Sequence, residues 1–338
     1  MRGERHPNPD AHPLRGEDSG PLRQGYTACW GGSEVGQEVR GTLRKGARAG
    51  NLRQLVIAGG KGGTGKTTLA TSFLALSGSG VLVDCDVDAP NAHLLLGSVT
   101  DEQVVGTVEG YVARIDETAC TRCGTCEEAC FFYAIQEFRV EEVFCRGCAV
   151  CTMACPVGAI SMAERKVGDV RVARTDYGPL VWGELAYGEA GTGKFINALR
   201  DVGGEVALRE SSELIFVDAS AGIGCPLISS ITGADLMLAV AEPTVSGKSD
   251  LERALRVARH FGVRALVCVN RYDLHEPKAK EVERMAREVG AEPVGRIPYD
   301  PEVVKAVVEG MPVVAVSDGP AAGAIREVFG RVMERLFE

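Results

Sequence analysis

The sequence lacks any long apolar run. No stretch approaches the roughly 20 apolar residues that a membrane-spanning helix needs, and the mean hydropathy of the chain is only +0.01. The beginning of the chain also lacks the apolar core of a secretory signal. Because 45% of the residues are nevertheless hydrophobic, we expect a globular protein with no stable membrane insertion. The cysteines are clustered as metal ligands and not spread as bridges, so we expect a cytoplasmic location.

An excess of basic charge is also missing. The 338 residues carry a formal net charge of −9. Residues 1–53 contain nine Lys and Arg against six Asp and Glu, so the remainder carries −12. Nonspecific nucleic-acid binding depends on neutralising phosphates, and we therefore expect no nucleic-acid partner. Residues 1–51 are rich in Gly, Arg, Pro and Asp without a hydrophobic period, which predicts a disordered tail.

Cysteine, by contrast, is plentiful, and eight of the twelve cysteines fall within thirty-six positions. Thiolate sulfur suits iron–sulfur clusters or zinc. Two C-x2-C pairs would fill a zinc site, so the additional cysteines at gaps of two and three indicate bacterial-type ferredoxin spacing. A zinc or disulfide module is the alternative. The two runs are Cys120-x2-Cys123-x2-Cys126-x3-Cys130 and Cys145-x2-Cys148-x2-Cys151-x3-Cys155-Pro156.

The two cysteine runs are copies of each other, offset by 25 residues, and both copies end in Ala-Ile. In a two-cluster ferredoxin the fourth cysteine of each run ligates the other cluster. Phe131 stands where the first run would usually carry proline, which changes the turn but removes no ligand. We therefore predict two [4Fe-4S] clusters with two ligand sets. Ligand set one is Cys120, Cys123, Cys126 and Cys155, and ligand set two is Cys145, Cys148, Cys151 and Cys130.

A phosphate-binding loop is the second strong motif. Residues 55–58 read as a buried strand, and the segment after residue 67 has helical spacing. Between them, Gly60–Thr67 matches G-x4-G-K-[ST], whose backbone N–H groups surround phosphate. Lys66 should reach the β- and γ-phosphates, and the Thr67 hydroxyl should ligate Mg²⁺. A glycine-rich turn without a ligand is the alternative. The predicted nucleotide contacts are Gly60, Gly62, Gly63, Thr64, Gly65, Lys66, Thr67 and Thr68.

Lys61 points to one particular family of phosphate loops, because it occupies the position of the signature lysine in the deviant Walker A loop. The chain resembles the MinD/ParA/nitrogenase-iron-protein group of P-loop ATPases, and with its cysteines it resembles the subfamily that contains an inserted ferredoxin domain. The resemblance implies ATP and Mg²⁺ as cofactors. It also implies a homodimer, or a heterodimer with a paralogous ATPase, in which Lys61 of one subunit reaches the phosphates held by the other.

The same resemblance gives roles to residues at strand ends, where ligands gather in open α/β sheets. Asp86 would be the switch I aspartate that orients or activates water, with Asp88 as a second candidate and a solvated acidic turn as the alternative. Asp218 would hold Mg²⁺ through water. Asn270 would contact the adenine edge, or would be a plain turn residue. The predicted catalytic residues are Lys61, Lys66, Asp86 and Asp218.

The order of segments predicts an α/β fold with a mostly parallel sheet covered by helices on both faces, and a small inserted α+β ferredoxin domain. The ATPase domain should comprise residues 52–110 and 165–338, and the insert residues 111–164. Gly222 and Gly224 should give the switch II loop its freedom. The expected strands are residues 55–58, 81–83, 111–115 (the first strand of the insert), 170–173, 180–182, 214–218 and 265–269.

Two segments that could mislead resemble other functional motifs, a second phosphate loop and a membrane-surface helix. Gly188-x4-Gly193-Lys194 resembles a second phosphate loop, but Phe195 replaces the hydroxyl residue. We interpret it as a helix start capped by Thr192, on a surface that docks the ferredoxin or a partner. The final helix, residues 320–337, has one apolar face and an opposite face of zero net charge. Membrane-surface helices favour basic faces, so this helix should cover the sheet.

Together the motifs favour an ATPase whose nucleotide state gates electron transfer through the clusters to a redox partner. Eight ligands for two clusters leave no open iron position, which suits electron transfer. An alternative is an ATPase that assembles or inserts metalloclusters on an iron–sulfur client. Cys225 lies seven residues after Asp218, the offset of a ligand to the bridging cluster in the nitrogenase iron protein. A third possibility is a ParA/MinD-like positioning ATPase with structural or sensory clusters. The remaining cysteines are Cys29, Cys85 and Cys268.

Overall fold

The computed structural model describes residues 52–189 and 192–338. The predicted tail, residues 1–51, and Cys29 within it lie outside the described residues. Nine strands of the described part form one sheet. They are β1 (Arg53–Ala58), β2 (Gly80–Cys85), β3 (Val99–Ile115), β6 (Ile160–Thr175), β7 (Gly178–Leu185), β8 (Leu214–Ala219), β9 (Leu236–Ala241), β10 (Arg264–Asn270) and β11 (Glu292–Ile297).

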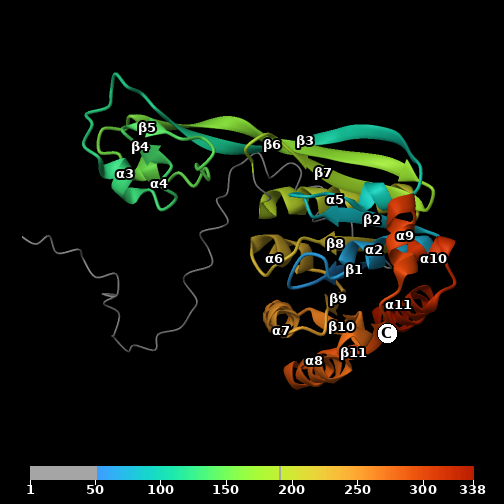
Figure 1. Ribbon diagram of the computed structural model, residues 1–338. Helices are drawn as coiled ribbons and strands as arrows, with labels where there is room; N and C mark the ends of the chain where they lie inside the picture. The colour runs from blue at the N-terminus through green and yellow to red at the C-terminus, as the bar shows by residue number, and fades with distance from the viewer. Residues whose placement is uncertain (1–51, 190–191) are drawn as a thin grey trace, which may run out of the picture. The chain divides into compact units, whose positions relative to one another are not determined.

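The strand order is β11-β10-β9-β1-β8-β2-β7-β6-β3 (Figure 1). All neighbours from β11 to β7 pair in parallel, whereas β6 pairs antiparallel with both β7 and β3. The predicted mostly parallel sheet is thus confirmed. Because parallel strands share one carboxyl edge, the residues that follow β1, β2, β8, β9 and β10 meet at that edge.

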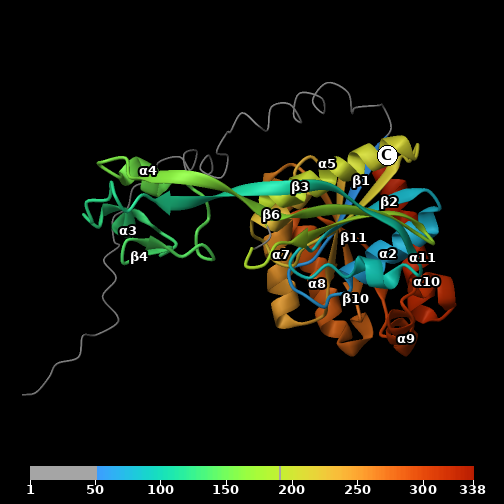
Figure 2. The ribbon, with the colours of Figure 1, turned by 90° about the horizontal axis from the view of Figure 1, so that it is seen from above.

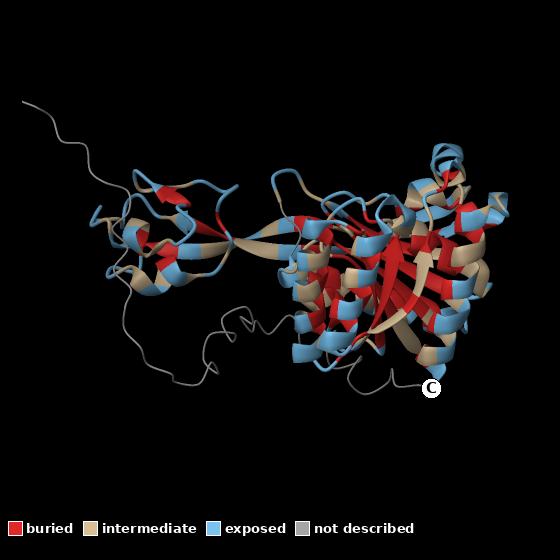
Figure 3. Cartoon of the chain, turned by 60° about the horizontal axis from the view of Figure 1, so that its bottom comes forward, coloured by how far each residue is buried: buried red, intermediate tan, exposed pale blue. Residues whose placement is uncertain are grey.

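Helices cover both faces of the sheet, as predicted. Side chains alternate along β1, so Val56 packs on one face and Leu55 on the other. Figure 3 shows the buried strands between helices whose outer faces are exposed. One face carries α5 (Gly193–Arg209), α6 (Cys225–Ile231), α7 (Val245–His260) and α8 (Glu276–Val289). The other carries α2 (Lys66–Ser77), α9 (Pro301–Glu309), α10 (Val313–Val316) and α11 (Pro320–Phe337).

The inserted segment lies between β3 and β6. These two strands pair from Val99–Thr175 to Ile115–Ile160, and Figure 2 shows them running together from the sheet to the insert. The strand predicted at residues 111–115 is therefore the far end of a much longer strand that begins within the ATPase sheet. The insert contains α3 (Thr125–Ala129), β4 (Ile135–Gln136), β5 (Arg139–Val140) and α4 (Val150–Ala154). Its small core includes Val112, Ile135 and several of the cysteines.

The two segments that could mislead behave as predicted. Thr192 caps α5 by accepting a hydrogen bond from the Phe195 amide, and the Phe195 ring is fully buried. The terminal helix α11 buries Ile325, Val328 and Val332 in the core beneath the sheet. Two short 3-10 helices, η2 (Ala92–Leu95) and η3 (Tyr272–Leu274), follow β2 and β10. Within the described part of the chain, no helix is long and apolar enough to cross a membrane.

Candidate functional site

The predicted phosphate loop connects β1 to α2 at the carboxyl edge of the sheet. Gly63 and Gly65 adopt the left-handed region, with φ of 77° and 95°, which favours glycine. The helix begins at Lys66, whose side chain is buried and whose Nζ donates to the Lys61 carbonyl at 3.2 Å. The loop thus folds back over its own lysine. A helix N-terminus with surrounding backbone N–H groups is a favourable site for an anion such as phosphate.

Gly60 is required by the close approach of α7. A Cβ atom at this position would lie 2.1 Å from the Cβ of Asp250 and 2.6 Å from its carbonyl carbon. Real Cβ atoms do not approach backbone this closely, so a side chain here would force the loop and α7 apart. The first glycine of the motif therefore fixes where Lys61 stands relative to α7.

Thr67 and Asp218 face each other across the loop. The Thr67 hydroxyl donates to Asp218 Oδ2 at 2.6 Å, and the other carboxylate oxygen, Oδ1, is buried without a hydrogen-bond partner. Burial raises the pKa of Asp218, nearby Asp84 raises it further, and the Thr67 hydrogen bond and Lys66 lower it. A hydroxyl beside a buried carboxylate with a free oxygen is a donor set that suits Mg²⁺. These residues therefore fit the predicted magnesium position.

Asp84, Asp86 and Asp88 have different surroundings. Asp84 is fully buried and accepts hydrogen bonds from the amides of Asp86, Asn91 and Ala92, so it shapes the turn after β2. Burial raises the pKa of Asp84 to about 6, and these amides oppose the shift. Asp86 is half-buried, and its pKa is raised by burial but lowered by Lys66. Asp88 is exposed. The role of Asp86 as the switch I aspartate, with Asp88 as the second candidate, stays a prediction.

Glu242 at the end of β9 is a site residue that the sequence reasoning missed. One of its carboxylate oxygens lies 3.0 Å from Lys61 Nζ, and the other accepts a hydrogen bond from Arg271 at 2.6 Å. Its side chain is only 14% exposed. A glutamate directly after a buried strand that ends at the site edge is the signal that could have identified it. Glu242 neutralises the signature lysine within its own chain.

Asn270 does not stand free at the end of β10. Its side-chain amide donates to the Thr64 carbonyl at 2.8 Å, and its oxygen accepts from the Arg271 amide at 2.9 Å. The side chain is buried and anchors the phosphate loop to the sheet. Asn270 therefore has a structural role at this edge of the sheet. Contact with an adenine edge stays a prediction.

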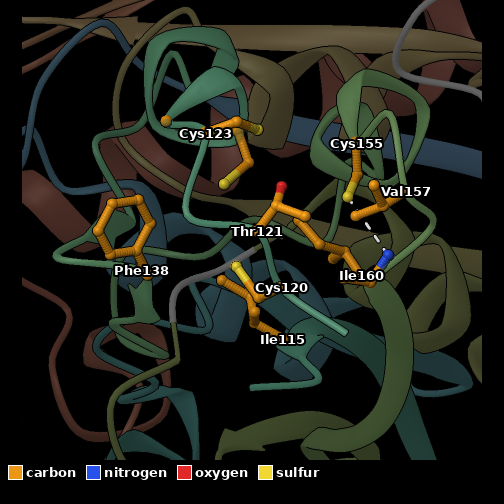
Figure 4. A pocket seen from close by; sticks show the side chains of 11 residues that line it. Ile115, Cys120, Thr121, Cys123, Phe138, Cys155, Val157 and Ile160 are labelled. Atoms are coloured by element: carbon orange, nitrogen blue, oxygen red, sulfur yellow. Dashed lines mark hydrogen bonds between the residues drawn. The ribbon is translucent and has the colours of Figure 1, made fainter. Parts of the chain in front are cut away.

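The four cysteines of ligand set one line a common pocket in the insert. Cys120, Cys123 and Cys126 come from the first run, and Cys155 comes from the second (Figure 4). A hydrogen bond from Thr125 lowers the pKa of the exposed Cys123, whereas burial raises the pKa of Cys126. Amides of Arg122 and Ala159 donate to the sulfurs of Cys120 and Cys155, at 3.4 and 3.3 Å. Such N–H···S bonds are typical of iron–sulfur ligands.

In ligand set two, the three cysteines of the second run are neighbours, and Cys130 resembles Cys155 in its hydrogen bonding. The pKa of Cys151 is raised by burial and by its neighbours Cys145 and Cys148, so these three thiols lie close together. The Ala134 amide donates to the Cys130 sulfur at 3.3 Å, as the Ala159 amide does to Cys155. The internal repeat in the sequence is thus repeated in the hydrogen bonding.

Among the described residues, no three His, Cys, Asp or Glu side chains converge on one metal ion. In a cubane cluster each thiolate binds a different iron atom, so the four sulfurs surround a cluster instead of meeting at one point. A pocket walled by cysteines and apolar side chains therefore fits a cluster better than a single zinc ion.

The other described cysteines differ in exposure. Cys85 and Cys268 are buried in the ATPase core, and burial raises the pKa of both thiols. Cys225 is exposed and begins α6, directly after the predicted switch II loop. Gly222 in that loop has a φ of 104°, which only glycine adopts readily. Phe131 is 85% exposed and makes an edge-to-face contact with Phe132.

With this geometry in place, comparison with known proteins identifies the family. Residues 55–313 match the family model described as the CobQ/CobB/MinD/ParA nucleotide binding domain. The chain belongs to this family. An uncharacterized protein of Methanocaldococcus jannaschii is 36% identical over 225 residues, which cover 66% of this chain and 79% of that protein. An uncharacterized ATP-binding protein of the same organism is 28% identical over 282 residues, covering 81% and 96%.

Solved structures of MinD share the fold. The MinD cell division protein of Aquifex aeolicus superposes with a TM-score of 0.51 at 22% identity, covering 83% of this chain and 97% of that one. MinD of Pyrococcus horikoshii, solved with Mg-ADP, gives 0.52 at 19% identity, covering 83% and 96%. At this identity the likeness establishes the fold alone. It confirms the predicted MinD-like architecture of the ATPase.

Proposed function

We propose that this chain is an ATP-hydrolysing iron–sulfur protein in which the nucleotide state gates electron transfer through two [4Fe-4S] clusters to a redox partner. Two observations support the proposal. The phosphate loop, Thr67 and Asp218 form one site at the carboxyl edge of the sheet. Four cysteines from both runs line one pocket in the insert.

The nucleotide site has a residue for each task. The loop amides would bind the phosphates, and Lys66 would neutralise their charge. Thr67 and Asp218 would hold Mg²⁺, which supplies Lewis-acid stabilisation of the phosphate oxygens when bound. Asp86 would orient the attacking water. The signature lysine, Lys61, would serve the neighbouring subunit in an ATP-dependent homodimer or heterodimer with a paralogue, as in the family it resembles.

The clusters supply one-electron chemistry, and the chain supplies their surroundings. All eight thiolates come from the insert, so every iron would be fully ligated, which favours electron transfer over cluster delivery. The insert exposes several apolar side chains, including Phe131, Tyr133 and Met153. A redox protein that contacts this surface would come close to ligand set two, because Phe131 directly follows Cys130. The cytoplasmic location expected from the cysteine pattern stays a prediction.

Anaerobic purification tests the proposal directly. We expect eight iron atoms and eight acid-labile sulfides per monomer, and an EPR signal after reduction with dithionite. Addition of ATP with Mg²⁺ should shift that signal or its midpoint potential, and Lys66→Ala should abolish the shift without lowering the iron content. Zinc in place of iron, or identical cluster properties with and without ATP, would overturn the proposal.

A second candidate function is an ATPase that assembles or inserts metalloclusters. The exposure of Cys225 beside the predicted switch II loop favours it, because two subunits of a dimer would each present this thiol. A shared four-iron cluster would need a second ligand from each subunit. Iron counting separates the two functions. An additional shared cluster in the ATP dimer would raise the count from eight to about ten per monomer, and Cys225→Ser would restore eight.

A further inference from the structure

Arg165 on β6 bridges the insert and the ATPase. Its Nη1 donates to the Glu142 carbonyl at 2.7 Å, and its Nη2 donates to the Cys145 carbonyl at 2.9 Å. The same Nη2 donates to one carboxylate oxygen of Glu189 at 3.1 Å, and Nε lies 2.9 Å from the other. The side chains of Arg165 and Glu189 are only 16% and 9% exposed. One shielded guanidinium thus holds the first ligand of the second cysteine run and a loop of the ATPase together.

The ATPase side of this bridge is the segment between β7 and α5. The Ala186 amide donates to the Val167 carbonyl of β6 at 2.8 Å. Lys194, in the first turn of α5, donates to the Glu109 carbonyl of β3. The residue that follows β7 is therefore attached to β6, and the first turn of α5 is attached to β3. This is the segment that resembled a second phosphate loop.

The same helix is packed against the element that follows switch II. A Cβ atom on Gly193 would lie 2.4 Å from the Ser229 hydroxyl of α6, so the two helices are in close contact. Arg200 of α5 donates to the carbonyls of Ser229 and Thr232, at 2.7 and 2.8 Å. Because α6 starts directly after the Gly222–Gly224 loop, a rearrangement of that loop would be transmitted to α5.

We propose that Arg165 couples the nucleotide site to the cluster held by Cys145, acting as a positioning residue whose charge is controlled by Glu189. This inference rests on the proposed function. While the Glu189 carboxylate is paired with the Arg165 guanidinium, it cancels most of the guanidinium charge. When α5 moves and Glu189 is drawn away from Arg165, the positive charge beside Cys145 is uncompensated. A nearby positive charge stabilises the reduced, more negative cluster and so raises its potential.

The first cysteine run is held differently. The Cys120 amide donates to the Asp116 carbonyl at 2.9 Å, and the Asp116 carboxylate accepts from the Thr118 amide at 2.9 Å. These contacts all lie within the insert. We therefore expect the cluster of ligand set one to be insensitive to nucleotide. The nucleotide response should be confined to the cluster of ligand set two.

EPR-monitored redox titration of the full chain, with dithionite as reductant, tests this assignment. In the wild type, ADP and a non-hydrolysable ATP analogue should change the reduced-to-oxidised ratio of one cluster, at fixed potential, by about fivefold or more, the low end of couplings between sites. Arg165→Gln should lower the potential of that cluster and remove its nucleotide response. Glu189→Gln should raise the potential and also remove the response. Arg165→Lys keeps the charge and should restore the basal potential but not the full response.

Arg114→Gln is the matched control. Arg114 lies on β3, where its side chain pairs with the Glu142 carboxylate and is 51% exposed. Its substitution should leave both potentials and the nucleotide response unchanged. Hydrogen exchange gives a readout independent of the clusters: amides of residues 142–148 should exchange faster in Arg165→Gln and not in Arg114→Gln.

The outcomes separate this inference from the proposed function. A wild type that responds to nucleotide, with an equal response in Arg165→Gln and Glu189→Gln, would overturn the role of Arg165 and leave gating intact. A wild type without any response would overturn both. Iron content of eight per monomer and unchanged ATP affinity in each variant show that folding and both sites are preserved.

Discussion

At the scale of single residues, the contact between Glu242 and Lys61 has a consequence for assembly. Lys61 cannot neutralise Glu242 in its own chain and reach phosphates in a neighbouring subunit at the same time. Arg271 keeps the carboxylate compensated when Lys61 leaves. The pair Lys61–Glu242 should therefore compete with the proposed ATP-dependent dimer, and Arg271 should weaken that competition.

This competition predicts opposite effects of two substitutions. Glu242→Gln should strengthen the ATP-dependent dimer about two- to fivefold, because a partly exposed ion pair contributes about 1 kcal/mol or less. Arg271→Gln should weaken the dimer, because Lys61 must then neutralise Glu242 without the help of Arg271. Sedimentation with a non-hydrolysable ATP analogue measures both. Glu252→Gln, in a surface pair with Arg256 on α7, is the control. If both variants changed the affinity of the dimer in the same direction, the proposed competition for Lys61 would be wrong.

The predicted magnesium ligands, Thr67 and Asp218, give a second prediction at the scale of single residues. Thr67→Val keeps the shape of the side chain but removes the hydroxyl that donates to Asp218. We expect Mg-ATP affinity to fall by about tenfold or more, with little change in the affinity for ATP measured in EDTA. Thr71→Val is the control, because Thr71 lies one turn further along α2 and bonds only to backbone carbonyls. Equal losses with and without Mg²⁺ would exclude Thr67 as a ligand.

Some of these residues could be predicted from the sequence because their roles are local. Lys66 and Thr67 follow the glycines of one short motif, and the cysteines repeat at fixed gaps. Glu242 and Arg165 could not be predicted in this way. Each acts on residues at least twenty positions away, and only the sheet order and the pairing of β3 with β6 bring those residues together.

At the scale of elements, the stability of two variants can test whether the terminal helix α11 covers the sheet. Ile325 of α11 is buried beneath the sheet, whereas Phe337 near the helix end is 51% exposed. Ile325→Ala should lower the free energy of unfolding by about 2–4 kcal/mol, and Phe337→Ala by about 0.5 kcal/mol or less. Urea denaturation measures both. Equal small effects, together with co-sedimentation on anionic vesicles, would indicate a membrane-facing helix instead.

The ion pair between α8 and β11 predicts a pH dependence. Arg296 donates to both oxygens of Glu283, at 2.6 and 2.7 Å, and lowers the pKa of Glu283 below its ordinary value of 4.5. A carboxyl with a lowered folded pKa stabilises the fold above its unfolded pKa and loses that effect as pH falls through the folded value. Glu283→Gln should therefore cost about 1–2 kcal/mol at pH 7. The difference from wild type should shrink below about pH 4; a constant difference from pH 7 to 3 would contradict the assignment.

At the scale of the whole molecule, the alternation of strands and helices was sufficient to predict the parallel sheet and its two covered faces. The boundary of the insert was harder to place. The hydrophobic pattern at residues 111–115 marks a strand, but it does not reveal that the strand starts at Val99 in the ATPase sheet. A strand shared by two cores has no break in composition at the border, so the border is set by packing against the insert's core and α5.

Because β3 and β6 pair with each other on both sides of the insert, the insert can in principle be removed from the ATPase. Joining Gly110 to Arg165 through Asn-Gly would close β3 and β6 with a tight turn, because these two residues are direct partners in the ladder. The shortened chain should bind no iron but should keep ATP affinity within about threefold of wild type, since the phosphate loop, Asp218 and Asn270 lie outside the insert. Fluorescent-nucleotide titration and iron analysis measure the two properties. A folded chain that has lost ATP binding would show that the insert is part of the nucleotide site, and that the two chemistries cannot be treated as separate modules joined through Arg165.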